Sequence, residues 1–203
     1  MTPALKAALI EAAVTTIAAH ADELTGLDQA IGDGDHGINM KRGFDAIAES
    51  KDVIAALPDD EALQKAGMTL VMKVGGASGP LYGSLLMGMA KAAKAGHDLE
   101  GQLAEGIAMV RKRGKSDAGA KTMLDVLMPV HATLKEHADL SPAETIMAVR
   151  QTADEAREAT RDMQASRGRA SFLGERSVGH YDPGATSSRL LIQAVCDVLE
   201  AEG

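Results

Sequence analysis

The chain has 203 residues and a formal net charge of −8 at pH 7, which argues against nucleic acid as a partner because nucleic acid selects basic surfaces. Apolar residues make up 45% and aromatic residues only 2%, so disorder is not expected and the core must be aliphatic. Cys196 is the single cysteine, there is no signal-peptide layout, and no apolar run approaches the roughly 18 residues of a membrane span. We therefore expect a cytoplasmic protein that needs neither a disulfide nor a membrane.

Apolar side chains recur at helical spacing between glycine-rich breaks along the chain. In the first segment, Leu5, Leu9 and Ile17 fall on one helix face. Ser141 followed three residues later by Glu144 matches a capping box at a helix start. No stretch alternates at period two, so we predict an all-α single domain over residues 1–203 without a sheet. The expected helices cover residues 3–21, 38–57, 61–74, 81–95, 99–113, 120–138, 142–165 and 185–200.

A short acidic stretch, residues 28–37, interrupts the helical pattern. It combines Asp28, Asp33 and Asp35 with several glycines, and each Gly costs about 1 kcal/mol relative to Ala inside a helix, so we predict a loop. Crowded carboxylates repel one another unless a cation lies between them, and Mg²⁺ prefers oxygen ligands of this kind. The alternative at this point is a solvated acidic turn that caps the following helix.

Two familiar motifs fit this stretch only in part. Residues 32–37 have the G-x-G-x-x-G spacing of a dinucleotide fingerprint, but that fingerprint needs a preceding strand and a turn without acidic side chains. An EF-hand loop starting at Asp33 needs Gly at its sixth and Glu at its twelfth position, where this chain has Ile38 and Phe44. We reject both interpretations.

Two further loops combine glycine with small polar residues, as backbones that approach a ligand closely must. Residues 75–79 precede a helix N-terminus, where free amides and the helix dipole favour an anion such as phosphate. An ordinary helix–helix turn is the alternative. Residues 114–122 are similar to a P-loop, but Ala120 disturbs the spacing and no strand precedes it, so the P-loop interpretation is rejected. The loop could still lie against the flat part of a ligand.

A fourth loop, residues 168–184, is too long for a plain connection. Arg169 and Arg176 could bind phosphate, and Asp182 could accept a hydrogen bond. A disordered surface loop is the alternative.

The four loops together, in this order, resemble the nucleotide-binding L subunit of dihydroxyacetone kinase. The matching motifs are Gly-Asp-Gly-Asp-His-Gly at 32–37, Gly-Gly-Ala-Ser-Gly-Pro at 75–80, Gly-Ala-Lys-Thr-Met at 119–123, Gly-Arg-Ala-Ser-Phe-Leu-Gly-Glu-Arg-Ser-Val-Gly-His at 168–180 and Asp-Pro-Gly-Ala at 182–185. The resemblance implies an eight-helix antiparallel barrel or bundle, with the nucleotide and two Mg²⁺ ions at one end.

The resemblance also implies which residues form the site. The metal-binding aspartates of the family correspond to Asp28, Asp33 and Asp35. The nucleotide contacts correspond to His36, Gly37, Ile38, Asn39, Ala77, Ser78, Gly114, Met123, Arg169, Asp182, Pro183 and Gly184. No residue of this chain is expected to form a covalent intermediate, because phosphoryl transfer rests on positioning and electrostatic stabilisation.

The function implied by the resemblance is that of the ADP- or ATP-binding subunit of a kinase for dihydroxyacetone or a related keto-sugar. The sugar is held on a separate K subunit, and bound ADP is rephosphorylated by a phosphotransferase-system protein fed from phosphoenolpyruvate. Two alternatives stay open: an L subunit that uses exchangeable ATP, and a nucleotide-sensing module that binds a transcription regulator. A homodimer is also considered.

Overall fold

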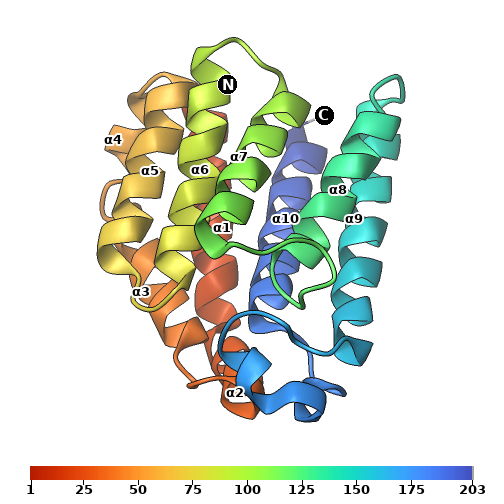
Figure 1. The fold of residues 1–203 in the computed structure, drawn as a ribbon. Coiled ribbons are helices and arrows are strands. Elements are labelled where there is room, and N and C mark those ends of the chain that lie inside the picture. The colour runs from red at the N-terminus through yellow and green to blue at the C-terminus, as the bar shows by residue number, and fades with distance from the viewer. Residues whose placement is uncertain (203) are drawn as a thin grey trace.

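The computed structural model describes residues 1–202, and these residues contain no strand. Ten α-helices and two 3₁₀ segments follow one another along the described chain (Figure 1). Their bounds are α1 Pro3–Ala19, α2 Ala21–Ile31, α3 His36–Ala48, α4 Lys51–Ala56, α5 Asp59–Lys73, α6 Ser78–Lys94, α7 Leu99–Gly114, α8 Leu124–Glu136, α9 Pro142–Ala159, η1 Thr160–Asp162, η2 Arg169–Ser177 and α10 Pro183–Glu202.

The predicted all-α architecture is confirmed, but α2 lies where no helix was expected, and the helix expected over residues 38–57 is interrupted. α1 and α2 meet at His20 with a bend of 56°. α3 and α4 are separated by Glu49 and Ser50. When each pair is counted as one rod, eight rods run alternately up and down along residues 1–202 (Figure 1).

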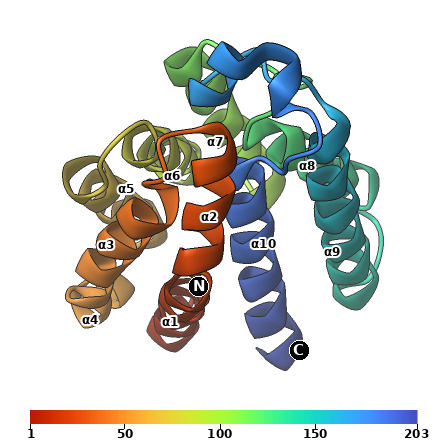
Figure 2. The ribbon, with the colours of Figure 1, turned by 90° about the horizontal axis from the view of Figure 1, so that it is seen from below.

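The rods close into a ring. Each one packs against its neighbours in sequence, and α10 packs against both α9 and α1. Figure 2 shows the ring from the end where α2 and η2 lie. Because the rods alternate in direction, the α2–α3, α5–α6, α7–α8 and α9–α10 connections share this end, at the bottom of Figure 1. The alternation therefore brings together the four loops that the sequence singles out.

Close helix approach compensates for the scarcity of aromatic side chains. A Cβ atom at Gly67 would lie 3.0 Å from the carbonyl oxygen of Gly83, and one at Gly106 would lie 2.8 Å from that of Leu85. α5, α6 and α7 consequently approach almost backbone to backbone, so smaller side chains can fill the space between them. The core is aliphatic, as expected, with fully buried residues such as Ile17, Leu24 and Met40.

The expectation that Asp28 lies in a loop is wrong. Asp28 is in the last turn of α2, which continues through Gly26 to Ile31. Leu24, Asp28 and Ile31 share the buried face of this helix, and tertiary packing of such a face outweighs the unfavourable helix propensity of one glycine.

Several helix boundaries also differ from the prediction, two of them by four residues or more. α8 begins at Leu124 rather than near residue 120, because Lys121 has φ +61°, a left-handed conformation that a right-handed helix does not contain. α9 ends at Ala159 and passes into η1 instead of continuing to residue 165. The capping box of Ser141 and Glu144 at the start of α9 is confirmed.

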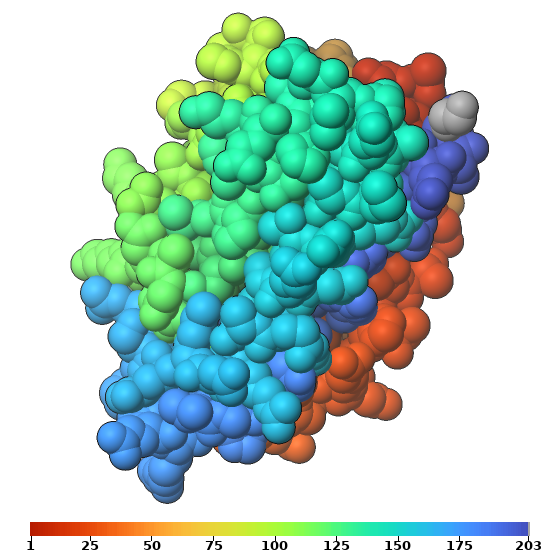
Figure 3. All heavy atoms as spheres, turned by 90° about the vertical axis from the view of Figure 1, so that its right-hand side faces the viewer, coloured from red at the N-terminus to blue at the C-terminus, as the bar shows by residue number. Residues whose placement is uncertain are grey.

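The segment expected as a long loop, residues 168–184, contains η2. In the space-filling view of Figure 3, the blue segment around η2 covers the lower end of the barrel and adjoins the green α7–α8 connection. The amide of Ser166 donates to the carbonyl of Ala120 at 3.2 Å, which joins the two segments directly.

Within residues 1–202, no single helix has the length and apolar composition needed to cross a membrane, although α1 and α2 meet that test when they are taken together across their bend.

Candidate functional site

A cavity of about 400 Å³ opens at the end of the barrel where the four connections meet. All four loops contribute to its lining. The lining includes the predicted residues Asp28, Asp33, Asp35, His36, Ala77, Ser78, Met123, Arg169, Asp182, Pro183 and Gly184. It also includes residues that the sequence did not single out as site residues: Ile31, Gly76, Leu81, Tyr82, Lys121, Thr122, Arg167, Gly168 and Ala170.

One wall of the cavity is acidic. We call Asp28, Asp33 and Asp35 the aspartate turn, and one carboxylate oxygen from each lies within 4.8 Å of the others. Asp28 comes from α2, whereas Asp33 and Asp35 lie on either side of Gly34, whose φ of +72° is one that glycine adopts readily. Three carboxylate oxygens this close fit a hard divalent cation such as Mg²⁺.

The two oxygens of Asp28 have different surroundings. Oδ2 accepts hydrogen bonds from the amides of Asp35 at 2.8 Å and His36 at 3.1 Å, at the start of α3. Oδ1 points toward Gly32, where an added Cβ would lie only 2.1 Å away. Glycine at position 32 therefore leaves space around Oδ1, so this oxygen can serve a metal while Oδ2 holds the turn in shape.

Arg169 reaches the aspartate turn from η2. Its Nη2 lies 2.9 Å from Oδ2 of Asp33, and both side chains are exposed. An exposed ion pair of this kind contributes about 0–1 kcal/mol. The guanidinium can therefore leave the carboxylate at little cost, and its paired donors suit a phosphate group.

His36 lies under the aspartate turn and is only 7% exposed. Its Nδ1 is 2.8 Å from Oγ of Ser78, and its Nε2 is 2.9 Å from Oγ of Ser187. Burial lowers the pKa of His36 to about 4, although the negative charge of Asp28 acts in the opposite direction. The imidazole is therefore neutral at pH 7 and is held between two hydroxyl groups.

Four predicted nucleotide contacts lie outside the lining of this cavity. Gly37 packs α3 against α2, and a Cβ there would lie 1.9 Å from the carbonyl oxygen of Ala21. Asn39 is buried beside the 75–76 loop, while Ile38 is 55% exposed. Gly114 ends α7 next to Leu81. Their contacts with a nucleotide stay predictions.

Comparison with known proteins identifies the family. The model of the DAK2 domain matches residues 30–197, which is most of the chain and includes Asp33, Asp35 and the three later loops. The chain belongs to the DAK2 domain family. The resemblance to the L subunit of dihydroxyacetone kinase, predicted from the four loop motifs, is confirmed.

Several bacterial relatives match this DAK2 domain along most of their length. It is 46% identical to the ADP-binding subunit DhaL of PEP-dependent dihydroxyacetone kinase 1 of Listeria innocua, covering 85% of this chain and 84% of that protein. It is 44% identical to the corresponding Escherichia coli subunit, covering 84% of each. The triokinase/FMN cyclase of Bos taurus is 33% identical over 96% of this chain, which corresponds to only 35% of that longer protein.

Solved structures share the fold. The crystal structure of the dihydroxyacetone kinase from C. freundii in complex with AMP-PNP and Mg²⁺ matches with a TM-score of 0.78 and 25% identity, covering 96% of this chain and 34% of that one. The native form of the same enzyme matches with a TM-score of 0.79 at 24% identity. The neighbour is three times longer than the matched region, so the likeness concerns one part of that enzyme.

Another part of the cavity lining of this DAK2 domain is built around a buried lysine, Lys121, that is only 1% exposed. We call this arrangement the lysine clamp: Lys121 Nζ donates to the carbonyls of Met163, at 3.0 Å, and Ser177. Met163 precedes η2 in the chain, and Ser177 is the last residue of η2. Burial lowers the pKa of Lys121, while the negative charges of Asp182 and Asp162 act in the opposite direction.

Asp125 shapes the turn that carries the clamp. Its carboxylate accepts hydrogen bonds from the amides of Gly119, at 2.5 Å, and Thr122, at 2.6 Å. Asp125 and Lys121 were not predicted as site residues, because their partners become apparent only in the folded chain. The one signal in the sequence was the P-loop-like spacing around Lys121, which we rejected as a phosphate site.

Asp182 closes the cavity from the start of α10. Its Oδ2 accepts from the amide of Ala185 at 2.6 Å, which caps the helix. Burial raises the pKa of Asp182 to about 7, and the negative charges of Asp125 and Asp28 raise it further, against the opposing effects of the Ala185 amide and Lys121. The uncharged form of this carboxyl group is therefore much more favoured than in an exposed aspartate.

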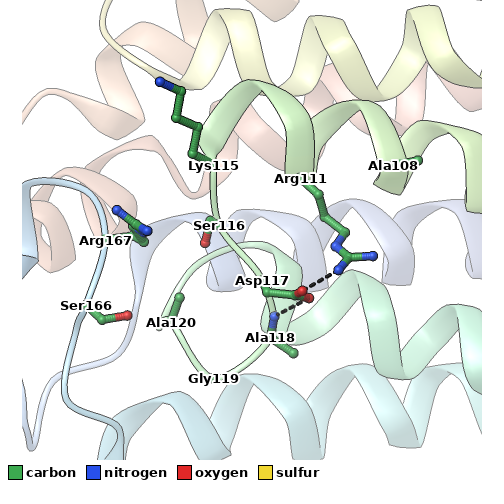
Figure 4. A pocket seen from close by; sticks show the side chains of 10 residues that line it. All are labelled: Ala108, Arg111, Lys115, Ser116, Asp117, Ala118, Gly119, Ala120, Ser166 and Arg167. Carbon is green, nitrogen blue, oxygen red and sulfur yellow. Dashed lines mark hydrogen bonds and ion pairs between the residues drawn. The ribbon is translucent and has the colours of Figure 1, made fainter.

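A second, more open hollow of about 640 Å³ lies along the α7–α8 connection. Figure 4 shows Ser166 and Arg167 on one side of it and Asp117 on the other, where Asp117 pairs with Arg111. Arg167 lines both the hollow and the cavity. Ser116 Oγ is buried here without a hydrogen-bond partner among the described residues, so the hollow offers a polar group that a ligand could satisfy.

Proposed function

We propose that this DAK2 domain is the ADP-binding subunit of a PEP-dependent dihydroxyacetone kinase. In this proposal, it binds a nucleotide with two Mg²⁺ ions and transfers a phosphoryl group to dihydroxyacetone, or a related keto-sugar, on a separate K subunit. The observation that carries the proposal is that the aspartate turn and the first turn of α6 line the same cavity. Relatives that bear this name are 44–46% identical over most of both chains.

The charges of the site support a ligand made of metal and nucleotide together. The aspartate turn contributes −3 if all three carboxylates are ionised, and ADP contributes about −3 near pH 7. Without cations these groups would bring about −6 into one small cavity, whereas two Mg²⁺ ions reduce the sum to about −2. Arg169 can offset part of the remainder. We therefore expect metal and nucleotide to bind as a pair.

Each group of residues in the cavity lining has a separate role in the proposed reaction. Asp28, Asp33 and Asp35 would hold the metal ions, which neutralise charge on the phosphates when bound. Ser78 and the free amides at the start of α6 would donate to phosphate oxygens. Arg169 would cover the phosphates from η2. These residues bind and orient the reacting group, and none of them needs to become covalently modified.

The other end of the nucleotide would extend toward the second hollow. Met123 lines the cavity, and Gly114 ends α7 just before the 115–120 stretch that lines the hollow. Met123 offers an adaptable apolar contact for a flat base. The unpartnered Ser116 hydroxyl would meet a polar edge of that base.

The share of each relative that this chain covers supports a kinase whose functions are divided among separate subunits. The bacterial ADP-binding subunits are covered to 84% by this chain, whereas the triokinases are covered to only about a third. We propose that the sugar-binding function lies on a separate K subunit and that a phosphotransferase-system protein rephosphorylates bound ADP. A transcription regulator and a second copy of this chain are further candidate partners.

An ATP-dependent version of the same chemistry is the competing proposal. The triokinases at 33% identity and the structural neighbour bound to AMP-PNP and Mg²⁺ favour it. The two versions differ in whether the nucleotide leaves during each cycle. η2 covers the site, which favours slow release and hence a nucleotide that is rephosphorylated in place.

Native mass spectrometry of the freshly purified protein tests the proposal first. We expect a mass increase equal to ADP with Mg²⁺, and the Asp35→Asn variant purified in parallel should lack it. A second test loads the protein with ATP and adds the K subunit and triose. We expect one phosphorylated product per chain and then a stall until the phosphodonor protein is supplied. Continuous turnover with ATP alone would support the ATP-dependent version, and absence of any nucleotide binding would refute both.

A further inference from the structure

Basic residues gather on two stretches of an otherwise acidic chain. Residues 111–120 and 161–177 together carry eight basic and three acidic residues, a net charge of +5, so the rest of the chain carries −13. The amide of Ser166 donates to the carbonyl of Ala120 and joins the two stretches, which adjoin at the lower end of the barrel in Figure 3. The positive charge is therefore concentrated at the end of the barrel that carries the cavity.

All eight of these basic residues are exposed, and we call them the basic rim: Arg111, Lys112, Arg113, Lys115, Arg161, Arg167, Arg169 and Arg176. Ion pairs occupy two of them, Arg111 with Asp117 and Arg169 with Asp33, and the other six have no ion-pair partner within residues 1–202. Exposed charges act over a Debye length, which is about 10 Å at 0.1 M salt. The rim therefore presents a positive field to a molecule that approaches from solvent.

Phe172 lies on one of the two stretches and is 85% exposed, whereas the other three aromatic residues of the chain are buried or half-buried. The segment that carries it is packed. Leu173 contacts a small apolar cluster that includes Ile31, and Ser177 Oγ donates to the carbonyl of Gly174 at 2.6 Å. Single exposed apolar side chains are common, but an aromatic ring on a segment rich in arginine is a combination that is enriched at protein–protein interfaces.

The basic rim adjoins the cavity directly. Arg167 and Arg169 line the cavity, and Arg167 also lines the second hollow together with Arg111 and Lys115. A protein that exchanges a phosphoryl group with a nucleotide in this cavity therefore meets part of the rim as it approaches.

The charges of the proposed reactants indicate which protein the rim would meet. With ADP and two Mg²⁺ ions bound, the site would keep a net charge of about −2, so it would repel an incoming anion. A phosphodonor protein brings its phosphoryl group with a charge of about −2, whereas the keto-sugar on a K subunit is neutral. The phosphodonor therefore gains more than the K subunit from a basic surface beside the cavity.

We propose that the basic rim and Phe172 form the docking surface for the phosphodonor protein, which would present an acidic face to them. This inference rests on the proposed function, because a freely exchanging nucleotide needs no phosphodonor. The rim raises the rate of association with the acidic face, and Phe172 becomes buried in the complex as an anchor.

Phosphoryl transfer then takes place within the docked complex. The bond between the donor side chain and phosphorus breaks while a β-phosphate oxygen of ADP forms its bond to phosphorus. The donor side chain keeps the electron pair of the broken bond and takes up a proton, so ADP becomes ATP without an oxidant or a reductant.

Rephosphorylation of bound ADP tests the docking surface, when it is followed by rapid quenching after mixing with the cognate phosphodonor protein charged from phosphoenolpyruvate. We expect Phe172→Ser to lower the second-order rate constant about tenfold, as the loss of an interface anchor predicts. Arg176→Glu should lower it about fivefold at low salt and less at high salt, because salt screens the attraction. Met147→Ser, at an exposed position of α9, and Lys94→Glu, at the far end of α6, are the matched controls and should react at the wild-type rate.

Two further measurements separate docking from nucleotide binding and from sugar phosphorylation. Phe172 and Arg176 do not line the cavity, so both variants should bind Mg–ADP with wild-type affinity in calorimetry. A loss of affinity that accounts for the slower reaction would overturn the proposal. Transfer from the ATP-loaded protein to triose on the K subunit should change by less than about twofold, because the sugar is neutral. Slowing of that step by as much as the phosphodonor step would assign the surface to the K subunit and overturn the proposal.

The remaining outcomes distinguish this inference from the proposed function. A wild-type protein whose bound ADP is not rephosphorylated by the phosphodonor would refute the proposed function and this inference with it. A wild-type protein that is rephosphorylated at a rate independent of salt and of both substitutions would refute this inference alone. A basic patch can also bind nucleic acid. Binding of a duplex DNA oligomer by the wild type that is lost in Arg176→Glu would therefore overturn the choice of a protein partner.

Discussion

Two charged parts of the cavity lining, the aspartate turn and the lysine clamp, differ in how their charges are compensated. The aspartate turn brings three carboxylates within 4.8 Å of one another, and the one cation that pairs with it among the described residues is the exposed Arg169. In the lysine clamp, backbone carbonyls stabilise the charge of Lys121, and backbone amides stabilise the charge of Asp125 in the turn that carries the clamp. The negative charge of the aspartate turn needs a positively charged ligand to compensate it, whereas the charged groups of the lysine clamp have their partners without a ligand.

This difference separates binding from folding. Substitutions in the aspartate turn should change ligand affinity and leave the fold stable, because they relieve repulsion between carboxylates in the ligand-free protein. Substitutions in the lysine clamp should destabilise the fold, because they leave buried backbone groups without partners. The following predictions test this distinction, from the largest expected effect to the smallest.

Asp35→Asn should nearly abolish Mg–ADP binding. Removing one partner of a close charge arrangement costs about 3–5 kcal/mol, which corresponds to at least a hundredfold loss of affinity. Isothermal titration calorimetry measures the loss, and urea unfolding without ligand should show unchanged or higher stability. Asp22→Asn, at an exposed acid on α2, is the matched control. Affinity within a few-fold of wild type would show that the aspartate turn does not hold the metal.

Asp182→Asn should change how stability depends on pH. The pKa of Asp182 is raised from 3.8 to about 7 by burial, so the neutral carboxyl is favoured in the folded protein. Its contribution to stability is fully present below about pH 4 and is lost as the pH rises to about 7. The variant should avoid this loss, which amounts to up to about 4 kcal/mol.

Urea unfolding in EDTA between pH 4 and 8 measures this effect. His36 acts in the opposite direction, because its lowered pKa of about 4 removes stability as the pH falls from about 6.5 to 4. Because His36 is present in both proteins, its contribution cancels when the free energy of unfolding of Asp182→Asn is compared with that of wild type. The exposed Asp52→Asn is the control. A difference that stays constant with pH would contradict the prediction.

Lys121→Met should lower the free energy of unfolding by about 2–3 kcal/mol, because the carbonyls of Met163 and Ser177 lose their donor. Mg–ADP affinity should fall by much less than in Asp35→Asn, since the lysine holds the wall and does not balance the phosphates. Urea unfolding and calorimetry measure the two effects. Lys135→Met, at an exposed position of α8, is the control. A loss of affinity as large as that of Asp35→Asn would assign Lys121 to the phosphates.

Arg169→Gln should have the smallest effect on folding. Its ion pair with Asp33 is exposed and contributes less than about 1 kcal/mol. Affinity for Mg–ADP should fall about tenfold, and dissociation should become faster because a charged contact from η2 is lost. Stopped-flow release of a fluorescent ADP analogue measures this rate. Arg176→Gln, at an exposed arginine of the same segment, should release the analogue at the wild-type rate.

The sequence by itself determined the helical class and the location of the site along the chain. Helical periodicity and the absence of alternating stretches are local properties, so the all-α class followed directly from them. The aspartates and glycines of residues 28–37 are close in sequence, so their crowding was also visible locally. The alternation of eight rods then brings every second connection to the same end, which explains why four separated loops form one cavity.

The tertiary structure alone decided which residues support that cavity. His36 meets Ser187 across 151 residues, and Lys121 meets Ser177 across 56. No local pattern reveals such pairs, because burial and hydrogen-bond partners arise only when the ring of helices closes. The placement of Asp28 in α2 has the same cause: packing of its buried face outweighs the propensity of a neighbouring glycine. Local composition therefore marked the loops that line the cavity, while long-range packing determined how the residues around it are held.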